Sequence, residues 1–185
     1  MLPLTWILAP PIATDTRPMR QPGSLTARLA RSDTVSVDVR FSGWQAARHD
    51  EAAALGLPRA GQRVYVREVC VRRNGAPAVL ARSVTTRGGI YGPWKGLRTL
   101  GRKPLAALLW TDPRICRGPF EFTRLPLGTQ PPARRSCFWL DGRPLIVMEA
   151  FVGLPWPAVG WLPRQRRWRA TCRNQRTTGF QITTA

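Results

Sequence analysis

The chain reads Arg63-Val-Tyr-Val-Arg-Glu-Val-Cys-Val-Arg72, then Asn74-Gly75, then Ala76-Pro-Ala-Val-Leu-Ala-Arg-Ser-Val84. Asn-Gly between two apolar runs is the strongest short signal of a β-hairpin, because both central residues of a type I′ turn need positive φ. A second hairpin is predicted for residues 134–152, where Asp141-Gly142 joins two further apolar runs. Residues 34–41 alternate with a period of two, which indicates a half-buried strand. Paired hairpins of this kind favour an antiparallel sheet.

Short helices and loops are predicted between these strands. The pattern predicts helical turns at 24–30, a loop or a short alanine-rich helix at 44–59, a loop at 88–92, two short helices within 94–110 and a strand at 114–127. The two helices are separated at Gly101 and Pro104. The expected fold is therefore α+β, with a single antiparallel sheet of about six hairpin-connected strands and a few short helices.

The length and the charge of the chain limit its class. A chain of 185 residues has the length of one domain. It contains 29 Lys and Arg against 10 Asp and Glu, a net charge of +19, and this charge first suggests a nucleic-acid-binding protein. No apolar run is long enough to predict a membrane span. The apolar, proline-containing N-terminus lacks a charged region typical of a secretory signal, so we expect a cytoplasmic protein.

Cysteine and histidine usage argues against a metal site. No two of the four cysteines are spaced as a C-x-x-C pair, and the one histidine, His49, lies in a polar stretch typical of a protein surface. We therefore predict no metal and no histidine-activated nucleophile. Cys70 and Cys137 fall within apolar strand patterns and are predicted to act as small core residues.

The turn at Asn74-Gly75 predicts which residues of the first hairpin share a face. A two-residue turn sets the register, and counting outward from it places Arg67 opposite Arg82. The predicted face also carries Val69, Val71, Ala78 and Leu80. Arginines on an inward face need an anion, which either a protein carboxylate or a bound ligand could supply.

The second hairpin places an acid next to an arginine. Counting outward from Asp141-Gly142 puts Arg134 opposite Glu149, at the end of an apolar stripe. This pair could be a simple ion pair at a sheet edge. Alternatively, the buried arginines and the glutamate line a pocket for a small, carboxylated and partly apolar molecule.

At these residues the sequence resembles the chorismate pyruvate-lyases, which make 4-hydroxybenzoate for ubiquinone. The resemblance is carried, in the family's order, by Ser24-Leu25-Thr26, Thr34-Val35-Ser36-Val37, Arg67-Glu68-Val69, Leu80-Ala81-Arg82, Leu100-Gly101-Arg102-Lys103-Pro104-Leu105, Arg134-Arg135-Ser136, Gly142-x-Pro144-Leu145 and Glu149. It spans roughly residues 20–152. No single motif is specific, but their order makes the set fairly specific.

The resemblance implies a lyase-like domain over residues 1–152 whose loops close over a buried site for chorismate and 4-hydroxybenzoate. Arg67 would grip the ring carboxylate, Leu105 would contact the ligand through its backbone, and Glu149 would meet the ring hydroxyl. Leu25 would form an apolar wall where methionine is familiar in the family. Arg67 and Glu149 are thus the implied catalytic residues.

The resemblance also implies a reaction. Loss of enolpyruvate and of a proton from the adjacent ring carbon gives an aromatic product, so neither a metal nor a redox cofactor is expected. Glu149 could act as a base or only orient the hydroxyl, and both readings stay open. Arg82 is a candidate for the second carboxylate, and Arg134 is a supporting residue. We expect a monomer.

Residues 153–185 form a basic extension with six arginines, three tryptophans and no acid. Its composition predicts a poorly ordered extension. The alternatives are a weak contact with RNA or an acidic membrane, and a segment that folds onto the domain.

Two other functions remain open from the sequence. One is a non-catalytic module that binds a small aromatic carboxylate, because the effector domains of some transcription regulators resemble the lyase fold. The other is a basic nucleic-acid-binding protein, whose affinity would fall steeply with salt.

Overall fold

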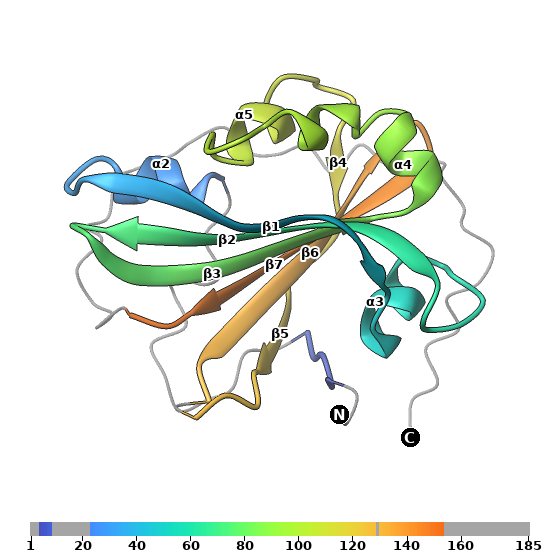
Figure 1. Ribbon diagram of the computed structural model, residues 1–185, viewed down its shortest axis with the longest axis horizontal. Helices are drawn as coiled ribbons and strands as arrows, with labels where there is room; N and C mark the ends of the chain where they lie inside the picture. The colour runs from blue at the N-terminus through green and yellow to red at the C-terminus, as the bar shows by residue number, and fades with distance from the viewer. Residues whose placement is uncertain (1–3, 9–22, 129, 154–185) are drawn as a thin grey trace.

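The computed structural model describes residues 4–8, 23–128 and 130–153. They form an α+β domain with one antiparallel sheet of seven strands, in the order β1-β2-β3-β7-β6-β4, with β5 paired to β6 (Figure 1). The strands are β1 (Val35–Ala46), β2 (Arg63–Arg73), β3 (Ala76–Thr85), β4 (Cys116–Arg117), β5 (Glu121–Arg124), β6 (Pro132–Leu140) and β7 (Arg143–Phe151). The predicted fold class is confirmed, with seven strands in place of about six.

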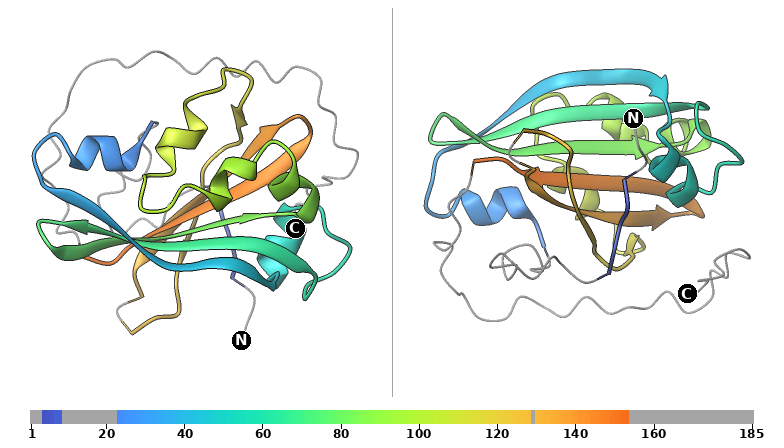
Figure 2. Two further views of the ribbon diagram at one scale, coloured as in Figure 1. Left: turned by 45° about the horizontal axis from the view of Figure 1, so that its top comes forward. Right: turned by 90° about the horizontal axis from the view of Figure 1, so that it is seen from below.

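The helices are short and stand on the two faces of the sheet. They are α2 (Leu25–Leu29), α3 (His49–Ala54), α4 (Arg87–Tyr91), the 3-10 helix η1 (Lys95–Arg98) and α5 (Ala106–Leu109). Figures 1 and 2 show α2, α4 and α5 on one face, whereas α3 and residues 4–8 lie on the other. The core is accordingly divided between the two faces, with Leu29 of α2 and Leu97 of η1 on the first and Leu55, after α3, on the second.

Both predicted hairpins are present, and their turns have the expected backbone. Asn74 and Gly75 have φ of 50° and 79°, and Asp141 and Gly142 have φ of 47° and 71°. A two-residue turn of this hand matches the twist of the strands that it joins. In the second hairpin Arg134 pairs with Glu149, as predicted.

The register predicted for the first hairpin is wrong beyond its turn. A bulge between Val71 and Arg72 shifts the pairing by one residue, so Arg67 lies opposite Ser83 and Glu68 lies opposite Arg82. An extra residue in one strand moves every later side chain to the other face relative to its predicted partner. Arg67 and Arg82 therefore point to opposite faces of the sheet.

Several boundaries also differ from the sequence prediction. Residues 88–92, expected as a loop, belong mostly to α4, because the Thr86 side chain accepts a hydrogen bond from the Gly89 N–H and caps the helix. Residues 44–46 continue β1, and α3 follows at 49–54. The single strand expected at 114–127 is two short strands separated by Gly118-Pro119-Phe120. Proline has no N–H for a sheet ladder, which accounts for the break.

Cys70 is buried and Cys137 is partly buried against the core, as expected for small apolar residues. Within the described residues, no helix is both long and apolar enough to cross a membrane. The predicted C-terminal extension lies outside the described residues, apart from Gly153.

Candidate active site

A cavity of about 80 Å³ lies between the sheet and the layer formed by α2 and α5. A single water needs about 10–15 Å³ of such space, so the cavity has room for a small molecule. Its apolar lining comes from both sides, and includes Leu25, Val69, Val79, Ala81, Leu105, Leu109, Phe138 and Val147. Its polar lining includes Arg67, Ser83, Arg117, Arg134, Ser136 and Glu149. The sequence prediction of an apolar pocket with a few charged groups matches this lining.

The sheet register explains why these side chains meet. Arg67 of β2 pairs with Ser83 of β3, which pairs with Val147 of β7. The next row on the same face places Glu149 of β7 between Ala81 of β3 and Arg134 of β6. Residues two apart along a strand share a face, so both rows face the cavity. The pairing of these four strands therefore sets which side chains form the cavity floor.

Arg67 is a buried cation that has no acidic partner in the described part of the chain. The residue is only 2% exposed. Its Nη2 donates to the carbonyl oxygens of Gly101 and Lys103, at 2.8 and 3.0 Å, and it forms no ion pair among the described residues. Burial lowers the pKa of Arg67. A guanidinium held in this way has donors left for an anion that enters the cavity.

Glu149 and Arg134 form an ion pair at the opposite side of the cavity floor. Both Nε and Nη2 of Arg134 lie 2.6 Å from Oε2 of Glu149. The Arg134 side chain is 2% exposed, whereas that of Glu149 is 20% exposed. The second oxygen of Glu149, Oε1, is not part of this ion pair, so the carboxylate can accept a further hydrogen bond at the cavity.

Leu25 and Leu105 form part of the wall that faces the sheet. Leu25 begins α2 and is 5% exposed, and the Ser24 side chain caps this helix by accepting from the Ala27 N–H at 3.1 Å. Leu105 precedes α5, and its carbonyl oxygen accepts from the N–H groups of Leu108 and Leu109. Both line the cavity. All four substrate contacts implied by the family resemblance therefore lie around one cavity.

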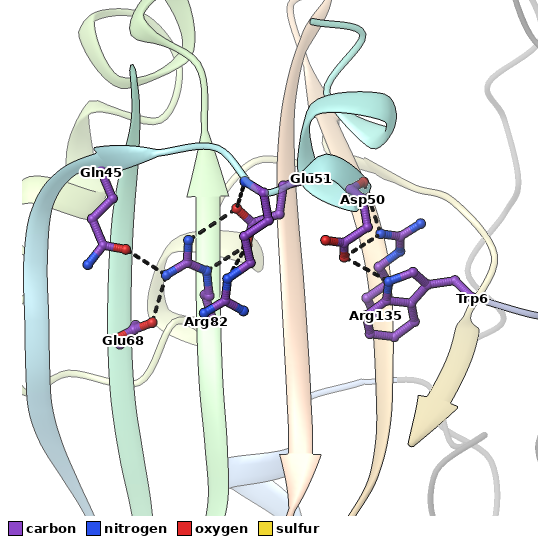
Figure 3. A network of polar contacts seen from close by, with 8 residues as sticks. Trp6, Gln45, Asp50, Glu51, Glu68, Arg82 and Arg135 are labelled. Carbon is purple, nitrogen blue, oxygen red and sulfur yellow. Dashed lines mark hydrogen bonds and ion pairs between the residues drawn. The ribbon is translucent and has the colours of Figure 1, made fainter. Parts of the chain in front are cut away.

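Arg82 does not line this cavity. Because of the bulge, it lies on the other face of the sheet, where it binds Glu51 of α3 at 2.6 Å, Glu68 at 2.7 Å and Gln45 at 2.8 Å (Figure 3). Burial lowers the pKa of Arg82, but the hydrogen bonds and charges of Glu51 and Glu68 outweigh it, and the net shift is upward. The expectation that Arg82 supplies a second substrate contact is thus corrected: it fastens α3 to the sheet.

A second arginine on the same face as Arg82 fastens the N-terminal segment. Arg135 of β6 binds Glu121 at 2.7 Å and Asp50 at 3.3 Å, and Asp50 also accepts from the indole N–H of Trp6 at 2.8 Å (Figure 3). The Arg135 guanidinium lies 4.4 Å from the Trp6 ring. These contacts leave the cavity face free for other groups.

Arg117 is a cavity residue that the sequence analysis missed. It belongs to the two-residue strand β4, pairs with Phe138, and lies with its guanidinium 4.2 Å from the Phe120 ring. Burial and the neighbouring charge of Arg134 lower its pKa, while Glu149 acts in the opposite direction. A two-residue strand has no readable alternation, so no pattern in the sequence marked Arg117 as inward-facing.

A family model described as chorismate lyase matches residues 8–157. The chain belongs to the chorismate lyase family. Its curated relatives include three proteins named "Probable chorismate pyruvate-lyase", from Albidiferax ferrireducens, Aromatoleum aromaticum and Pseudomonas putida. They are 39%, 38% and 40% identical to it, over 78%, 80% and 74% of this chain and 84%, 91% and 79% of their own.

Solved structures similar to this chorismate lyase family member include regulator domains. The C-terminal domain of the histidine utilization repressor from Pseudomonas syringae pv. tomato has a TM-score of 0.50 and 16% identity, over 71% of this chain and all of that domain. The PhnF C-terminal domain has a TM-score of 0.51 and 14% identity, over 71% of this chain and 93% of that domain. At these identities the likeness shows the shared fold alone.

In the described part of the chain, no cluster of three or more His, Cys, Asp or Glu could hold a metal.

Proposed function

We propose that this protein converts chorismate to 4-hydroxybenzoate and pyruvate, a first step towards ubiquinone. The observation that carries the proposal is Arg67, a buried guanidinium with no acidic partner among the described residues, in the same cavity as the Glu149–Arg134 pair. The cavity thus offers a cation for a carboxylate and an oxygen for a hydroxyl, joined by an apolar floor. The names of the curated relatives support the same substrate.

The proposed binding mode places the substrate ring over the apolar floor. Arg67 donates to the ring carboxylate, and Glu149 accepts from the ring hydroxyl. The strands that carry these residues, β2 and β7, are separated by β3, so their backbones lie about 10 Å apart across the sheet. Both side chains point towards the same cavity, which suits a ring with its carboxylate and hydroxyl at opposite ends. Leu25 and Leu105 cover the ring from the other side.

The proposed reaction is an elimination within the bound ring. The proton on the hydroxyl-bearing carbon is lost, its electron pair completes the aromatic ring, and the bond from the adjacent carbon to the ether oxygen breaks. Enolpyruvate leaves with the electron pair of the broken carbon–oxygen bond, and a proton added to its methylene carbon gives pyruvate. The protein orients the dianion and stabilises the charge that develops on the leaving group. Glu149 either takes the proton or orients the hydroxyl.

The test is direct conversion. Purified protein is incubated with chorismate, 4-hydroxybenzoate is followed by its absorbance, and pyruvate is followed by coupled reduction to lactate. We expect the two products in equal amounts. Arg67→Gln should lower the yield of both products. Arg59→Gln is its matched control, because Arg59 is exposed, lies outside the cavity lining and carries the same charge. The absence of both products would reject the proposal. Tight binding of chorismate without turnover would instead favour the effector-type module, whose fold the PhnF domain shares.

A further inference from the structure

The cavity holds more positive than negative charge. Its described lining contains three arginines, Arg67, Arg117 and Arg134, and one carboxylate, Glu149. Arg134 and Glu149 form the ion pair already described. Arg67 and Arg117 each form no ion pair with any described residue. Two cations around one small cavity therefore match a ligand that carries two negative charges.

Arg117 is held in place by an aromatic ring. Its guanidinium lies 4.2 Å from the centre of the Phe120 ring, and that of Arg134 lies 4.4 Å from the centre of the same ring. Stacking on an aromatic face leaves the edge of a guanidinium, which carries its N–H donors, open to an anion. Arg117 is thus a positioned donor, whereas a solvated surface arginine would have to lose side-chain freedom on binding.

The two cations lie at different ends of the floor. Arg117 stands on β4, next to β6, which carries Arg134, and the charge of Glu149 acts on it. Arg67 stands on β2, with β3 and β7 between it and β6. The Arg117 guanidinium is therefore close to the place where Glu149 would meet the ring hydroxyl, and remote from the place of the ring carboxylate.

Chorismate has its second carboxylate at that end of the ring. The enolpyruvyl ether is on the carbon next to the hydroxyl-bearing carbon, and the ring carboxylate is on the far side. We propose that Arg117 binds the carboxylate of the enolpyruvyl group, an inference that rests on the proposed function. The contact places a fixed positive charge next to the ether oxygen, which becomes the negatively charged oxygen of enolpyruvate as its bond to the ring breaks. Arg117 would then act on the leaving group and not on the aromatic product.

The inference is tested by comparing substrate with product. 4-Hydroxybenzoate lacks the second carboxylate, so Arg117→Gln should change its dissociation constant by no more than about twofold. The same variant should lower kcat/KM for chorismate by at least tenfold, the range expected for loss of a hydrogen bond between charged groups. Arg117→Lys, which keeps the charge without the planar fork, should recover part of the loss. Arg67→Gln should weaken the binding of both ligands, and Arg59→Gln should change the binding of neither.

The outcomes separate the two proposals. If the unaltered protein makes no product, the proposed function fails, and calorimetric binding of chorismate and 4-hydroxybenzoate still tests Arg117 through the ratio of the two dissociation constants. A ratio that Arg117→Gln leaves unchanged would overturn the inference. This includes an equal loss of affinity for both ligands, because such a loss would indicate a general effect on the cavity. A thermal unfolding midpoint near that of the unaltered protein confirms that each variant is folded.

Discussion

Arg67 and Arg82 leave neighbouring strands on opposite faces of the sheet, and of the two only Arg82 has acidic partners among the described residues. Arg82 binds the carboxylates of Glu51 and Glu68, whereas Arg67 binds two backbone carbonyl oxygens. The one-residue bulge before Arg72 separates them. The same residue type therefore has a structural role on one face, and on the other it is available to a ligand.

Removing Arg82 should destabilise the fold without weakening ligand binding. Arg82→Gln leaves Glu51, which is 5% exposed, with only the longer ion pair to the half-exposed Arg48 at 4.0 Å, and breaking a buried pair costs about 3–5 kcal/mol. Urea unfolding measures the change in the free energy of unfolding. The matched control is Arg72→Gln, whose ion pair with Asp38 is about 30% exposed and should contribute only ~0–1 kcal/mol. Equal losses in the two variants, or weaker 4-hydroxybenzoate binding by folded Arg82→Gln, would contradict the structural role.

Removing Arg67 should have the opposite effect, weakening ligand binding without destabilising the fold. Arg67→Gln should weaken 4-hydroxybenzoate binding by about 10- to 150-fold, the value of a hydrogen bond between charged groups, as measured by calorimetry. Arg67→Lys should restore little, because an ammonium cannot bind a carboxylate through two parallel hydrogen bonds while also reaching the Gly101 and Lys103 carbonyls. Unchanged affinity in both variants would remove Arg67 from the binding site.

Glu149 should recognise the ring hydroxyl. We expect the unaltered protein to bind 4-hydroxybenzoate at least about tenfold more tightly than benzoate, because a carboxylate is a strong acceptor for the hydroxyl. Glu149→Gln keeps an acceptor oxygen but loses the charge, so the preference should fall by about fivefold. The ratio of the two dissociation constants is the measurement, since loss of the Arg134 partner affects both ligands alike. A preference unchanged by the substitution would place the hydroxyl elsewhere.

Cys137 should be unreactive in the folded protein. Burial raises the pKa of its thiol to about 12, and only the thiolate reacts with alkylating agents. At pH 8 Cys137 should therefore be alkylated on the order of a thousandfold more slowly in the folded protein than in protein unfolded by urea. Mass spectrometry of the peptide that contains Cys137 follows the reaction. Rapid modification of the folded protein at pH 8 would contradict this.

The same raised pKa predicts a loss of stability in alkali. A group whose pKa is higher in the folded state stabilises the fold below its unfolded pKa of about 8.5, and this contribution disappears as the pH rises towards 12. Cys137→Ala, which cannot ionise, should lose less of its unfolding free energy than the unaltered protein between pH 9 and pH 11. The comparison by urea unfolding at several pH values measures the difference, and parallel curves would argue against it.

Three features could be predicted from the sequence, namely the two hairpins, the antiparallel sheet and the pairing of Arg134 with Glu149. These features depend on local turn chemistry, since Asn74-Gly75 and Asp141-Gly142 adopt the positive φ that only a few residue types tolerate. The motif resemblance also named Leu25, Arg67, Leu105 and Glu149, which meet around one cavity.

Contacts that form only in the folded sheet set which arginines face that cavity. The bulge turns Arg82 away from the cavity, and the turn residues Asn74 and Gly75 do not predict it. Arg117 faces inward because β4 adds to the edge of β6 for two residues and Phe120 stacks on its guanidinium. Local sequence encodes turns and alternation within a strand, whereas the partners of a charged side chain are set by contacts between distant segments, and these exist only once the sheet has formed.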